Sequence, residues 1–474
     1  MRAFLAALLL SAFAPAFPAR ADDAVTLRIM TFNVWYGGEQ VSLEKIGEAI
    51  RAADPDVVGL QEADRNLERI AAAAGMPYVD PRRRLLSRWP IFDPGAGLRT
   101  EEGPAPYSTT ALDRDALHAW VMVRPGQVVA VSNVHLSSGA ARDELRRAET
   151  APLTALGRLA EDGTPVFLTG DFNSTSHLDG AADGPSVSRM LADSGLRDSY
   201  REAHSDPVAS PGYTWTPGAP HPLADHEKRR SRIDYVFTAG RSETLGSQVV
   251  GEDGGPNTDI AVVPWPSDHR AVVSTFRVVP KPAPPLIAAL PRLVPQDTPV
   301  LLRTWDPSGP TWTALVVRRG GSPQDALTGV RDMPRDYQRT IPLSTLGLEP
   351  GDYDALLVGE DGAVLKRNGF TIAARDARPE VEAIDATVRP GAPIRVRWRG
   401  APGNLRDWVG LYKYGETDVS HYLGFVYTEA AFAGEAMLVP DPGISRAEAG
   451  DYELRLLEDE SYVVLAKSKL VQVR

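Results

Sequence analysis

Cysteine occurs nowhere in the 474 residues of this chain. Disulfides are therefore excluded, and so is lipid attachment through a cysteine, which leaves apolar cores and any bound metal to hold the fold. Long apolar runs are scarce as well, because no stretch after residue 21 is long and apolar enough to span a bilayer. With 43% hydrophobic and 24% charged residues, the composition is typical of soluble globular domains.

An excess of positive charge is also lacking. The chain has 62 acidic and 51 basic residues, which gives a formal net charge of -11. A protein that holds nucleic acid mainly through its phosphates needs a basic face, so this balance argues against tight, non-specific binding of polyanions. It leaves room for a local basic groove or for an acidic cluster that holds a cation.

The first 21 residues resemble a targeting segment and not a part of the fold. Arg2 supplies a positive start, residues 4–17 are apolar, and Ala19-Arg20-Ala21 fits a cleavage site with small residues. We therefore expect a signal peptide over residues 1–21 and a secreted or periplasmic mature protein. An N-terminal membrane anchor is the alternative, although Pro15 and Pro18 interrupt the apolar run.

The length predicts two to four domains, and the composition suggests where they divide. We expect a first domain over residues 22–278 and a stiff, proline-rich linker over 279–285. Beyond it, segments 299–305, 313–317 and 351–357 recur as 393–398, 408–412 and 450–456. This repeat of about ninety residues predicts two immunoglobulin-like β-sandwich modules, at 286–375 and 378–474.

Hydrophobic periodicity in residues 22–278 predicts strands with helices between some of them. The expected strands are 27–33, 57–60, 85–90, 118–123, 128–135, 166–168, 233–237 and 271–278. The expected helices are one that Ser42 caps, one over 67–74, one over 142–159 with a kink at Pro152, and a short one over 188–193. Helices need sheet faces to cover, so the pattern favours an α+β fold with a two-sheet sandwich and helices outside.

Polar residues recur where these strands end, at Asn33, Glu62, His135, Asp171 with Asn173, Asp234, and Asp268 with His269. Each has a plain structural explanation when taken alone. Asp171 could form an Asx-turn, Glu62 could cap a helix, and His135 could be a satisfied core histidine. Their recurrence after apolar runs is harder to explain by chance, because a buried carboxylate is costly unless it is paired or bound to metal.

Six motifs occur in one order along residues 26–278. They are Thr31-Phe-Asn33-Val-Trp, Leu60-Gln-Glu62, Asn133-Val-His135-Leu, Gly170-Asp171-Phe-Asn173, Arg232-Ile-Asp234-Tyr-Val-Phe and Ser267-Asp268-His269-Arg. This set resembles that of the endonuclease/exonuclease/phosphatase superfamily. The resemblance implies the four-layer α/β/β/α sandwich of the deoxyribonuclease I type and a metal-dependent phosphoric ester hydrolase.

The resemblance also implies a metal site and its ion. Glu62 would be the principal ligand, Asn33 would lie beside it, and Asp268 would be a further acidic contact near the metal or the attacking water. The expected ion is Mg²⁺, with Mn²⁺ as an alternative. Mg²⁺ prefers oxygen ligands and retains several waters, so one or two protein ligands and a substrate phosphate suffice.

The remaining motif residues would act on the substrate. By resemblance, Asp171 would position and deprotonate a water, and Asn173 would hold a phosphoryl oxygen. His269 would donate to the phosphate, with Asp234 as its orienting carboxylate, because a His–carboxylate pair fixes the tautomer and favours imidazolium. His135 would contact the phosphate from the other side. The implied reaction is in-line attack of water on phosphorus.

The substrate is left open by the sequence. The alternatives are a small or exposed phosphoester, DNA or RNA cleaved by an extracellular nuclease, sphingomyelin or another phospholipid, and non-catalytic binding through the modules. Inserts 93–116 and 174–231 are expected to wall the site. Two basic clusters, 82–84 and 228–230 with Arg232, could grip phosphate or form solvated faces. The modules could bind a surface, pack on the catalytic domain, or act as spacers.

Overall fold

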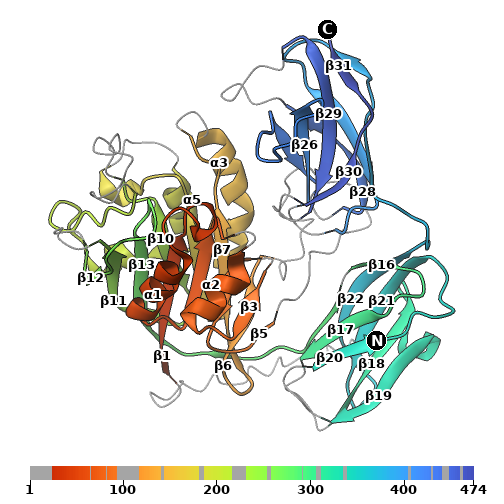
Figure 1. The fold of residues 1–474 in the computed structure, drawn as a ribbon. Coiled ribbons are helices and arrows are strands. Elements are labelled where there is room, and N and C mark those ends of the chain that lie inside the picture. The colour runs from red at the N-terminus through yellow and green to blue at the C-terminus, as the bar shows by residue number, and fades with distance from the viewer. Residues whose placement is uncertain are drawn as a thin grey trace, which may run out of the picture.

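A computed structural model describes residues 24–63, 66–81, 83–92, 117–139, 143–180, 186–215, 231–252, 258–290, 292–305, 311–334, 339–403, 407–428, 431–439, 448–458 and 463–474. The expected signal peptide and the insert 93–116 lie outside these ranges. Figure 1 shows helices gathered in the N-terminal part of the chain and strand-rich modules in the C-terminal part. Among the described residues, no helix is long and apolar enough to cross a membrane.

The N-terminal region contains two seven-stranded sheets. The first has the order β12-β11-β13-β1-β2-β4-β3. Its strands are β1 (Val25–Asn33), β2 (Val57–Gln61), β3 (Tyr78–Asp80), β4 (Leu85–Ser87), β11 (Ser242–Gly251), β12 (Ile260–Ala261) and β13 (Ala271–Val278). Strand β1 runs parallel to β2 and antiparallel to β13. The expected strands 27–33, 57–60 and 271–278 therefore lie side by side.

The second sheet has the order β5-β6-β7-β8-β10-β9, and β14 pairs with β7. Its strands are β5 (Ile91–Phe92), β6 (Ala119–Arg124), β7 (Gln127–His135), β8 (Val166–Asp171), β9 (Arg197–Asp198), β10 (Asp234–Ala239) and β14 (Lys281–Pro282). Strand β8 lies between β7, to which it is parallel, and β10, to which it is antiparallel. This central place puts the end of β8 among the neighbouring strand ends.

Apart from α6 (Ser199–Ala203), the α-helices lie close to where the sequence predicts them. They are α1 (Leu43–Ala53), α2 (Leu67–Ala74), α3 (Asp143–Thr150), α4 (Ala155–Ala160), α5 (Val187–Asp193) and α6 (Ser199–Ala203), with short 3-10 turns η2 (Tyr36–Gly38), η5 (Ala151–Thr154) and η6 (His177–Asp179). Ser42 caps α1 by accepting the Lys45 N–H, as expected. The long helix expected over 142–159 is broken at Pro152, which lies in η5 between α3 and α4.

Three hydrophobic clusters organise the two sheets. The inner cluster contains Ile29 and Val57 from the first sheet with Val131 and Phe167 from the second. A second cluster packs the other face of the first sheet against α1 and α2, and a third packs the other face of the second sheet against η5, α4 and α5. The sheets thus share one core, and helices cover their outward faces.

Side chains on the inner faces change character along the strands. Because alternate residues of a strand share a face, Phe167, Thr169 and Asp171 of β8 all point inward. Apolar residues fill the inner core, a layer of buried polar residues follows, and charged residues lie at the strand ends. This order places the polar strand ends predicted from the sequence at one end of the shared core.

The C-terminal modules each contain two sheets. The first module has β15 (Leu286–Leu290), β16 (Leu293–Pro295), β17 (Val300–Trp305), β18 (Thr311–Arg318), β19 (Thr328–Pro334), β20 (Arg339–Leu343), β21 (Gly351–Val358) and β22 (Val364–Ala373). The second has β23 (Glu380–Ala383), β24 (Thr387–Val388), β25 (Ile394–Arg399), β26 (Trp408–Lys413), β27 (Phe425–Tyr427), β28 (Ala433–Leu438), β29 (Gly450–Leu457), β30 (Val464–Lys467) and β31 (Val471–Val473). The repeated segments occupy equivalent strands: β17 and β25 are central in three-stranded sheets, and β18 and β26 pair with β21 and β29.

The segment 279–285 is extended but is bonded to the N-terminal region. Strand β14 pairs with β7, and the Ala283 N–H donates to the Gly126 carbonyl at 2.8 Å. The first module follows and packs its fully buried Trp305 edge-to-face on Phe92, with 5.5 Å between ring centroids. Leu286 and Trp305 belong to the same core cluster as the outward face of the second sheet. The first module therefore packs on the N-terminal region, which is one of the arrangements that the sequence left open.

Candidate active site

Register brings three of the predicted site residues into one row. His135, the last residue of β7, lies opposite Asp171, the last residue of β8. Asp234, the first residue of β10, lies opposite Asp171 on the other side. Neighbouring strands are about 4.8 Å apart, so these side chains are immediate neighbours on the inner face. The His135 Nε2 atom is 3.5 Å from the Asp171 Oδ2 atom.

The first sheet contributes Asn33 and Glu62 to the same place. Asn33 ends β1 opposite Gln61, and Glu62 follows Gln61. The Asn33 amide nitrogen donates to Glu62 Oε1 at 3.2 Å and to Asp171 Oδ2 at 3.1 Å. Asn33 is fully buried, and its amide therefore joins carboxylates from the two sheets.

The carboxylate of Glu62 is held at the surface by a strained backbone. Glu62 has φ +60°, which is uncommon for a non-glycine residue, and it is only partly buried. Its Oε2 accepts the Tyr36 N–H at 2.8 Å, and its own carbonyl accepts the Gly37 N–H at 2.7 Å. Backbone strain of this kind concentrates at functional sites, where the surrounding contacts maintain it.

His269 lies between two buried carboxylates. Its Nδ1 is 3.0 Å from Asp234 Oδ2, and its Nε2 is 3.7 Å from Asp171 Oδ2. The preceding loop fixes the ring, because the His269 N–H donates to Ser267 Oγ, which itself donates to the Asn33 carbonyl at 2.7 Å. Trp265 completes the support by donating its indole N–H to the His269 carbonyl.

These neighbours set the charge of the pair. Burial opposes a charged imidazole, but Asp234 and then Asp171 outweigh it and raise the pKa of His269 to about 10. Asp268 acts in the same direction. Burial and the nearby Asp171 carboxylate raise the pKa of Asp234 to about 6, although His269 opposes this shift. Near neutral pH, His269 is an imidazolium that two carboxylates hold in place.

The sequence left open whether Asn173 belongs to a structural Asx-turn or to the site. Asn173 has φ +48°, and its N–H donates to Asp171 Oδ1 at 2.9 Å, which is the Asx-turn expected as the plain explanation. Its side-chain nitrogen donates to the Leu136 carbonyl at 2.9 Å. The turn therefore holds the Asn173 amide one residue beyond the His135 strand end, so a structural turn and a place in the site are compatible.

A buried polar layer beneath the site is a feature that sequence reasoning missed. Gln61 donates to Thr31 Oγ1 at 3.1 Å and to Asn133 Oδ1 at 2.7 Å, and Thr169 also donates to Asn133 Oδ1 at 2.9 Å. Asn133 in turn donates to the Leu60 carbonyl at 2.7 Å. These residues join the two sheets directly below Asn33 and Asp171. The signal was present, because each lies two residues before a predicted site position or next to one.

Several polar residues of the insert 174–231 have structural partners. His177 Nδ1 is 2.8 Å from Ser188 Oγ, and His204 Nε2 is 2.8 Å from the Ser247 carbonyl oxygen. Arg232 is buried and paired with carboxylates, so it neither forms a solvated face nor grips phosphate. The cluster 228–230, His221 and His226 lie outside the described residues.

Two arrangements of residues bear on metal binding. Asp171, Asp234 and His269 each place one ligand atom within 4.8 Å of the others, a grouping that could hold a metal ion. In this arrangement, however, His269 Nδ1 is engaged with Asp234. Asn33 turns its oxygen to the Trp35 N–H at 3.0 Å and its nitrogen toward the carboxylates. Asn33 donates to two carboxylates, those of Glu62 and Asp171, and Glu62 is the more exposed of the two.

The geometry and the comparisons with known proteins define the class. The model of the Endonuclease/Exonuclease/phosphatase family matches residues 30–269, just over half of the chain, and the chain belongs to this family. Members of the family are hydrolases that act on phosphoester bonds, and they generally use a divalent metal. The matched range includes all eight predicted site residues.

Individual relatives are more distant. An uncharacterized Caenorhabditis elegans protein is 26% identical over 299 residues, which cover 53% of this chain and 92% of that protein. An endonuclease/exonuclease/phosphatase structure from Beutenbergia cavernae is 22% identical, covers 73% of this chain and all of that one, and has a TM-score of 0.36. The mannosyl-6-phosphatase of Bacteroides thetaiotaomicron is 17% identical, covers 53% and 99% of the two chains, and has a TM-score of 0.33.

Proposed function

We propose that this protein is a secreted or periplasmic, Mg²⁺-dependent phosphoesterase that hydrolyses phosphodiester or phosphomonoester bonds by in-line attack of water. The observation that carries the proposal is the buried group of Asp171, Asp234 and His269, joined through Asn33 to Glu62. It combines a candidate base, a fixed imidazolium and a partly exposed carboxylate at one end of the shared core. The positive φ of Glu62 also supports the assignment, because strained backbone concentrates at functional sites.

Each residue has a role that follows from its contacts. Asp171 positions a water and accepts its proton. His269 donates a hydrogen bond to the phosphate and stabilises charge in the transition state, and Asp234 keeps its ring oriented through Nδ1. His135, whose side chain is 30% exposed, contacts the phosphate from the other side of Asp171. Asn173 presents its amide to a phosphoryl oxygen.

The donor set fits a hard divalent cation. Glu62, Asn33 and Asp268 offer oxygen ligands, which Mg²⁺ prefers, and Mn²⁺ takes the same donors. Glu62 is only partly buried, so it can bind a cation that retains waters. A bound cation would neutralise the negative charge that develops on the phosphoryl oxygens. For Asn33 to join it, the amide oxygen has to serve the cation as well as the Trp35 N–H.

Hydrolysis of bis-p-nitrophenyl phosphate by the mature protein tests the proposal. We expect activity with Mg²⁺ that EDTA abolishes, and a loss of about 10²–10⁴-fold in Asp171→Asn and in His269→Ala. Equal activity, or equal inactivity, of the wild type and both variants would refute the catalytic assignment. Exposed Tyr414 lies in the second module, and Tyr414→Phe serves as a control that keeps full activity.

The same preparation identifies the substrate class. Plasmid DNA, RNA, sphingomyelin and a small phosphoester are offered in parallel, with Asp171→Asn beside each. Activity on DNA that falls steeply with salt would identify a nuclease, because nucleic-acid binding releases counterions. Activity on sphingomyelin vesicles alone would identify a phospholipase. If every substrate stays intact, a non-catalytic surface-binding protein becomes the better description.

Two further assignments belong to the proposal. We assign the catalytic region to the four-layer α/β/β/α sandwich of the deoxyribonuclease I type, supported by one core between the sheets and one on each outward face. We also assign the modules at 286–375 and 378–474 to the immunoglobulin-like sandwiches, supported by two sheets in each and by the repeated strands. Export of the mature protein after residue 21 is supported by the sequence of that segment.

A further inference from the structure

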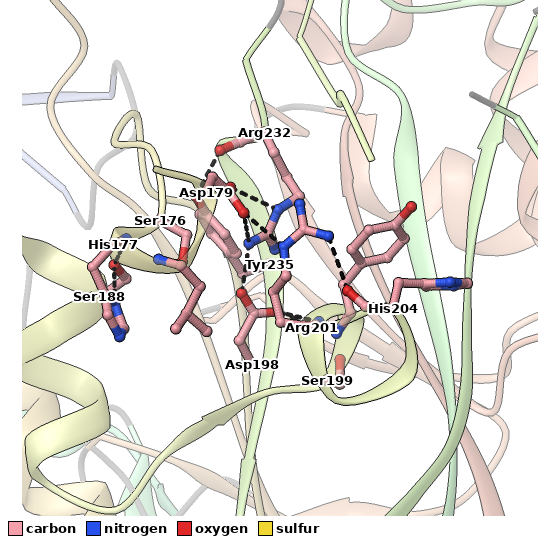
Figure 2. A network of polar contacts seen from close by, with 12 residues as sticks. Ser176, His177, Asp179, Ser188, Asp198, Ser199, Arg201, His204, Arg232 and Tyr235 are labelled. Atoms are coloured by element: carbon pink, nitrogen blue, oxygen red, sulfur yellow. Dashed lines mark hydrogen bonds and ion pairs between the residues drawn. The ribbon is translucent and has the colours of Figure 1, made fainter. Parts of the chain in front are cut away.

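Arg232 forms a buried fork that the site described above does not include. Its side chain is 2% exposed. Its Nε donates to Asp179 Oδ2 at 3.0 Å, and its Nη2 donates to Asp179 Oδ1 at 3.0 Å and to Asp198 Oδ2 at 2.7 Å. The guanidinium also lies over the Tyr235 ring, 4.6 Å from its centroid. Figure 2 shows the carboxylates of Asp179 and Asp198 on either side of this group.

Arg201 completes the network and balances its charge. Its Nε donates to Asp179 Oδ1 at 2.7 Å, so Asp179 is shared by two arginines (Figure 2). Its remaining nitrogens donate to the carbonyls of His204, Ser210 and Pro211. Two guanidinium groups thus face two carboxylates. The network has no excess positive charge to offer a substrate phosphate, and its role has to be sought in what it connects.

The network connects two of the segments that carry site residues, the one that contains Asn173 and the one that contains Asp234. Asp179 is the last residue of η6, the short turn that follows Asn173 in the chain, and Arg232 lies two residues before Asp234. Between them, the Phe172 N–H donates to the Ile233 carbonyl at 2.9 Å, and the Tyr235 hydroxyl donates to the Ser174 carbonyl at 2.9 Å. The Arg232 carbonyl lies 2.6 Å from the same hydroxyl, so the two carbonyls share its single hydrogen.

Asn173 is therefore held from both sides. The Phe172 bond lies before it, and the Ser174 bond and the Asp179 fork lie after it. Its φ of +48° lies in the left-handed region, which asparagine tolerates in an Asx-turn, so these contacts fix the place of the turn and not its conformation. Of these three contacts, the Arg232–Asp179 fork is the one between charged groups. The planar guanidinium of arginine fits a carboxylate with two parallel hydrogen bonds.

We propose that Arg232 is a positioning residue for hydrolysis: through Asp179 it holds the 172–179 segment against the residues that lead into β10, so that Asn173 keeps its place beside Asp171. The inference rests on the proposed function, because it assigns Asn173 a role in that reaction. Arg232 itself touches neither the substrate nor the reacting atoms.

The competing explanation is a buried ion pair that only stabilises the fold. Breaking such a pair is strongly destabilising whatever its neighbours do, so loss of stability cannot separate the two explanations. The energetic coupling between Arg232 and Asn173 can separate the two explanations. If Arg232 affects the rate through Asn173, the two substitutions are not independent, whereas a purely structural role gives effects that multiply.

The test is a double-mutant cycle of Arg232→Lys and Asn173→Gly in the full mature chain with bis-p-nitrophenyl phosphate. Lysine keeps the charge but loses the fork, and glycine adopts φ +48° without strain while it removes the amide. We expect Arg232→Lys to lower kcat about tenfold and to change KM less than about twofold. In the Asn173→Gly background the same substitution should lower kcat less than about twofold.

Arg455→Lys is the matched control. Arg455 is 1% exposed, pairs with Glu453, and lies over the Tyr412 ring at 4.1 Å in the second module. Its substitution should leave kcat unchanged in both backgrounds while thermal unfolding of that module shifts. Should Arg232→Lys not yield folded protein, Asp179→Asn is carried through the same cycle, because it breaks the fork at its more exposed end. Arg201→Lys is then measured beside it, because Asp179 also pairs with Arg201.

Three results would overturn the inference. They are an unchanged kcat in Arg232→Lys, an equal fold-loss in both backgrounds, and full activity of Asn173→Gly. None of them refutes the proposed function, which depends on the metal requirement and on Asp171→Asn. Conversely, wild-type protein without any hydrolytic activity refutes the proposed function and the inference together.

Discussion

At the scale of single residues, the site depends on one histidine whose charge is set by its neighbours. His269 has almost no contact with solvent, and Asp234 and Asp171 supply the negative charge that keeps it protonated. The sequence placed Asp234 and His269 in one motif set but 35 positions apart. Their direct contact follows from the pairing of β10 with β8 and from the loop that Ser267 and Trp265 hold.

The raised pKa of His269 predicts how stability of the metal-free protein depends on pH. The pKa is about 10 in the folded state against the ordinary value of 6.5, so the folded state binds the proton more tightly. This contribution is fully present below pH 6.5 and is lost as the pH rises toward 10. Urea unfolding over this range should show falling stability in the wild type and a smaller fall in His269→Gln.

Replacement of Asp234 should move the titration itself. Asp234→Asn removes the main source of the raised pKa, so the pKa of His269 should fall from about 10 toward 6.5. An NMR titration of the imidazole protons in the metal-free protein measures it, with His269→Gln for assignment. Asp162→Asn, which removes a distant carboxylate paired with Lys281, should leave the titration unchanged. A wild-type His269 that titrates near 6.5 would contradict the arrangement.

At the scale of elements, the polar layer under the site joins the two sheets. Glycine at position 59 makes this layer possible, because a Cβ there would collide with Thr169 Oγ1 and lie 2.5 Å from Asn133 Oδ1. The layer leaves no room for a side chain between β2 and the second sheet. The motif Leu60-Gln-Glu62 therefore depends on the residue that precedes it as well as on its own side chains.

Gly59→Ala should consequently be destabilising and should lower activity. Over-packing of a buried site costs about 1–3 kcal/mol. Here the displaced groups are Asn133 Oδ1, which accepts from Gln61, and Thr169 Oγ1, which donates to the same oxygen. Chemical denaturation and the rate on bis-p-nitrophenyl phosphate measure both effects. Gly246→Ala in β11 is the control, since a Cβ there meets nothing within 4 Å. Equal behaviour of the two variants would show that the layer tolerates expansion.

At the scale of the whole molecule, the first C-terminal module is part of the packing of the catalytic region. Trp305 is fully buried on Phe92, and β14 extends the second sheet through β7. Phe92 immediately precedes the insert 93–116, which the sequence predicts to wall the site. The alternative of a spacer separated by a free linker does not agree with these contacts.

Trp305→Ala should therefore destabilise the catalytic region. Truncation of a buried tryptophan costs about 3–5 kcal/mol, so the temperature at which hydrolytic activity is lost should fall by several degrees. Trp312→Ala is the matched control, because Trp312 is as deeply buried but lies in the module's own core. Trp312→Ala should weaken the module's own core but leave the Trp305–Phe92 contact in place, so the inactivation temperature should fall less than in Trp305→Ala. If both variants inactivate at the wild-type temperature, the interface contributes no stability.

Much of the fold was predictable because its signals are local. Period-2 and period-3.6 patterns located β1, β2, β7, β8, α1 and α2 to within a few residues. Strand β11 was missed because its first half is mostly exposed and lacks an apolar face, and α6 was missed because it is only five residues long. Local patterns fail where a segment is ordered mainly by its neighbours.

The sequence by itself determined which residues stand at the strand ends and in which order, because these depend on the spacing of apolar runs. It also determined the absence of disulfides and the repeat in the C-terminal half. Only the tertiary structure decided that Asn33 contacts both Glu62 and Asp171, the latter 138 positions away. It also decided that Arg232 is buried in a fork and that Trp305 joins the core on the outward face of the second sheet. These contacts form between segments far apart in the chain, so strand register and packing choose the partners.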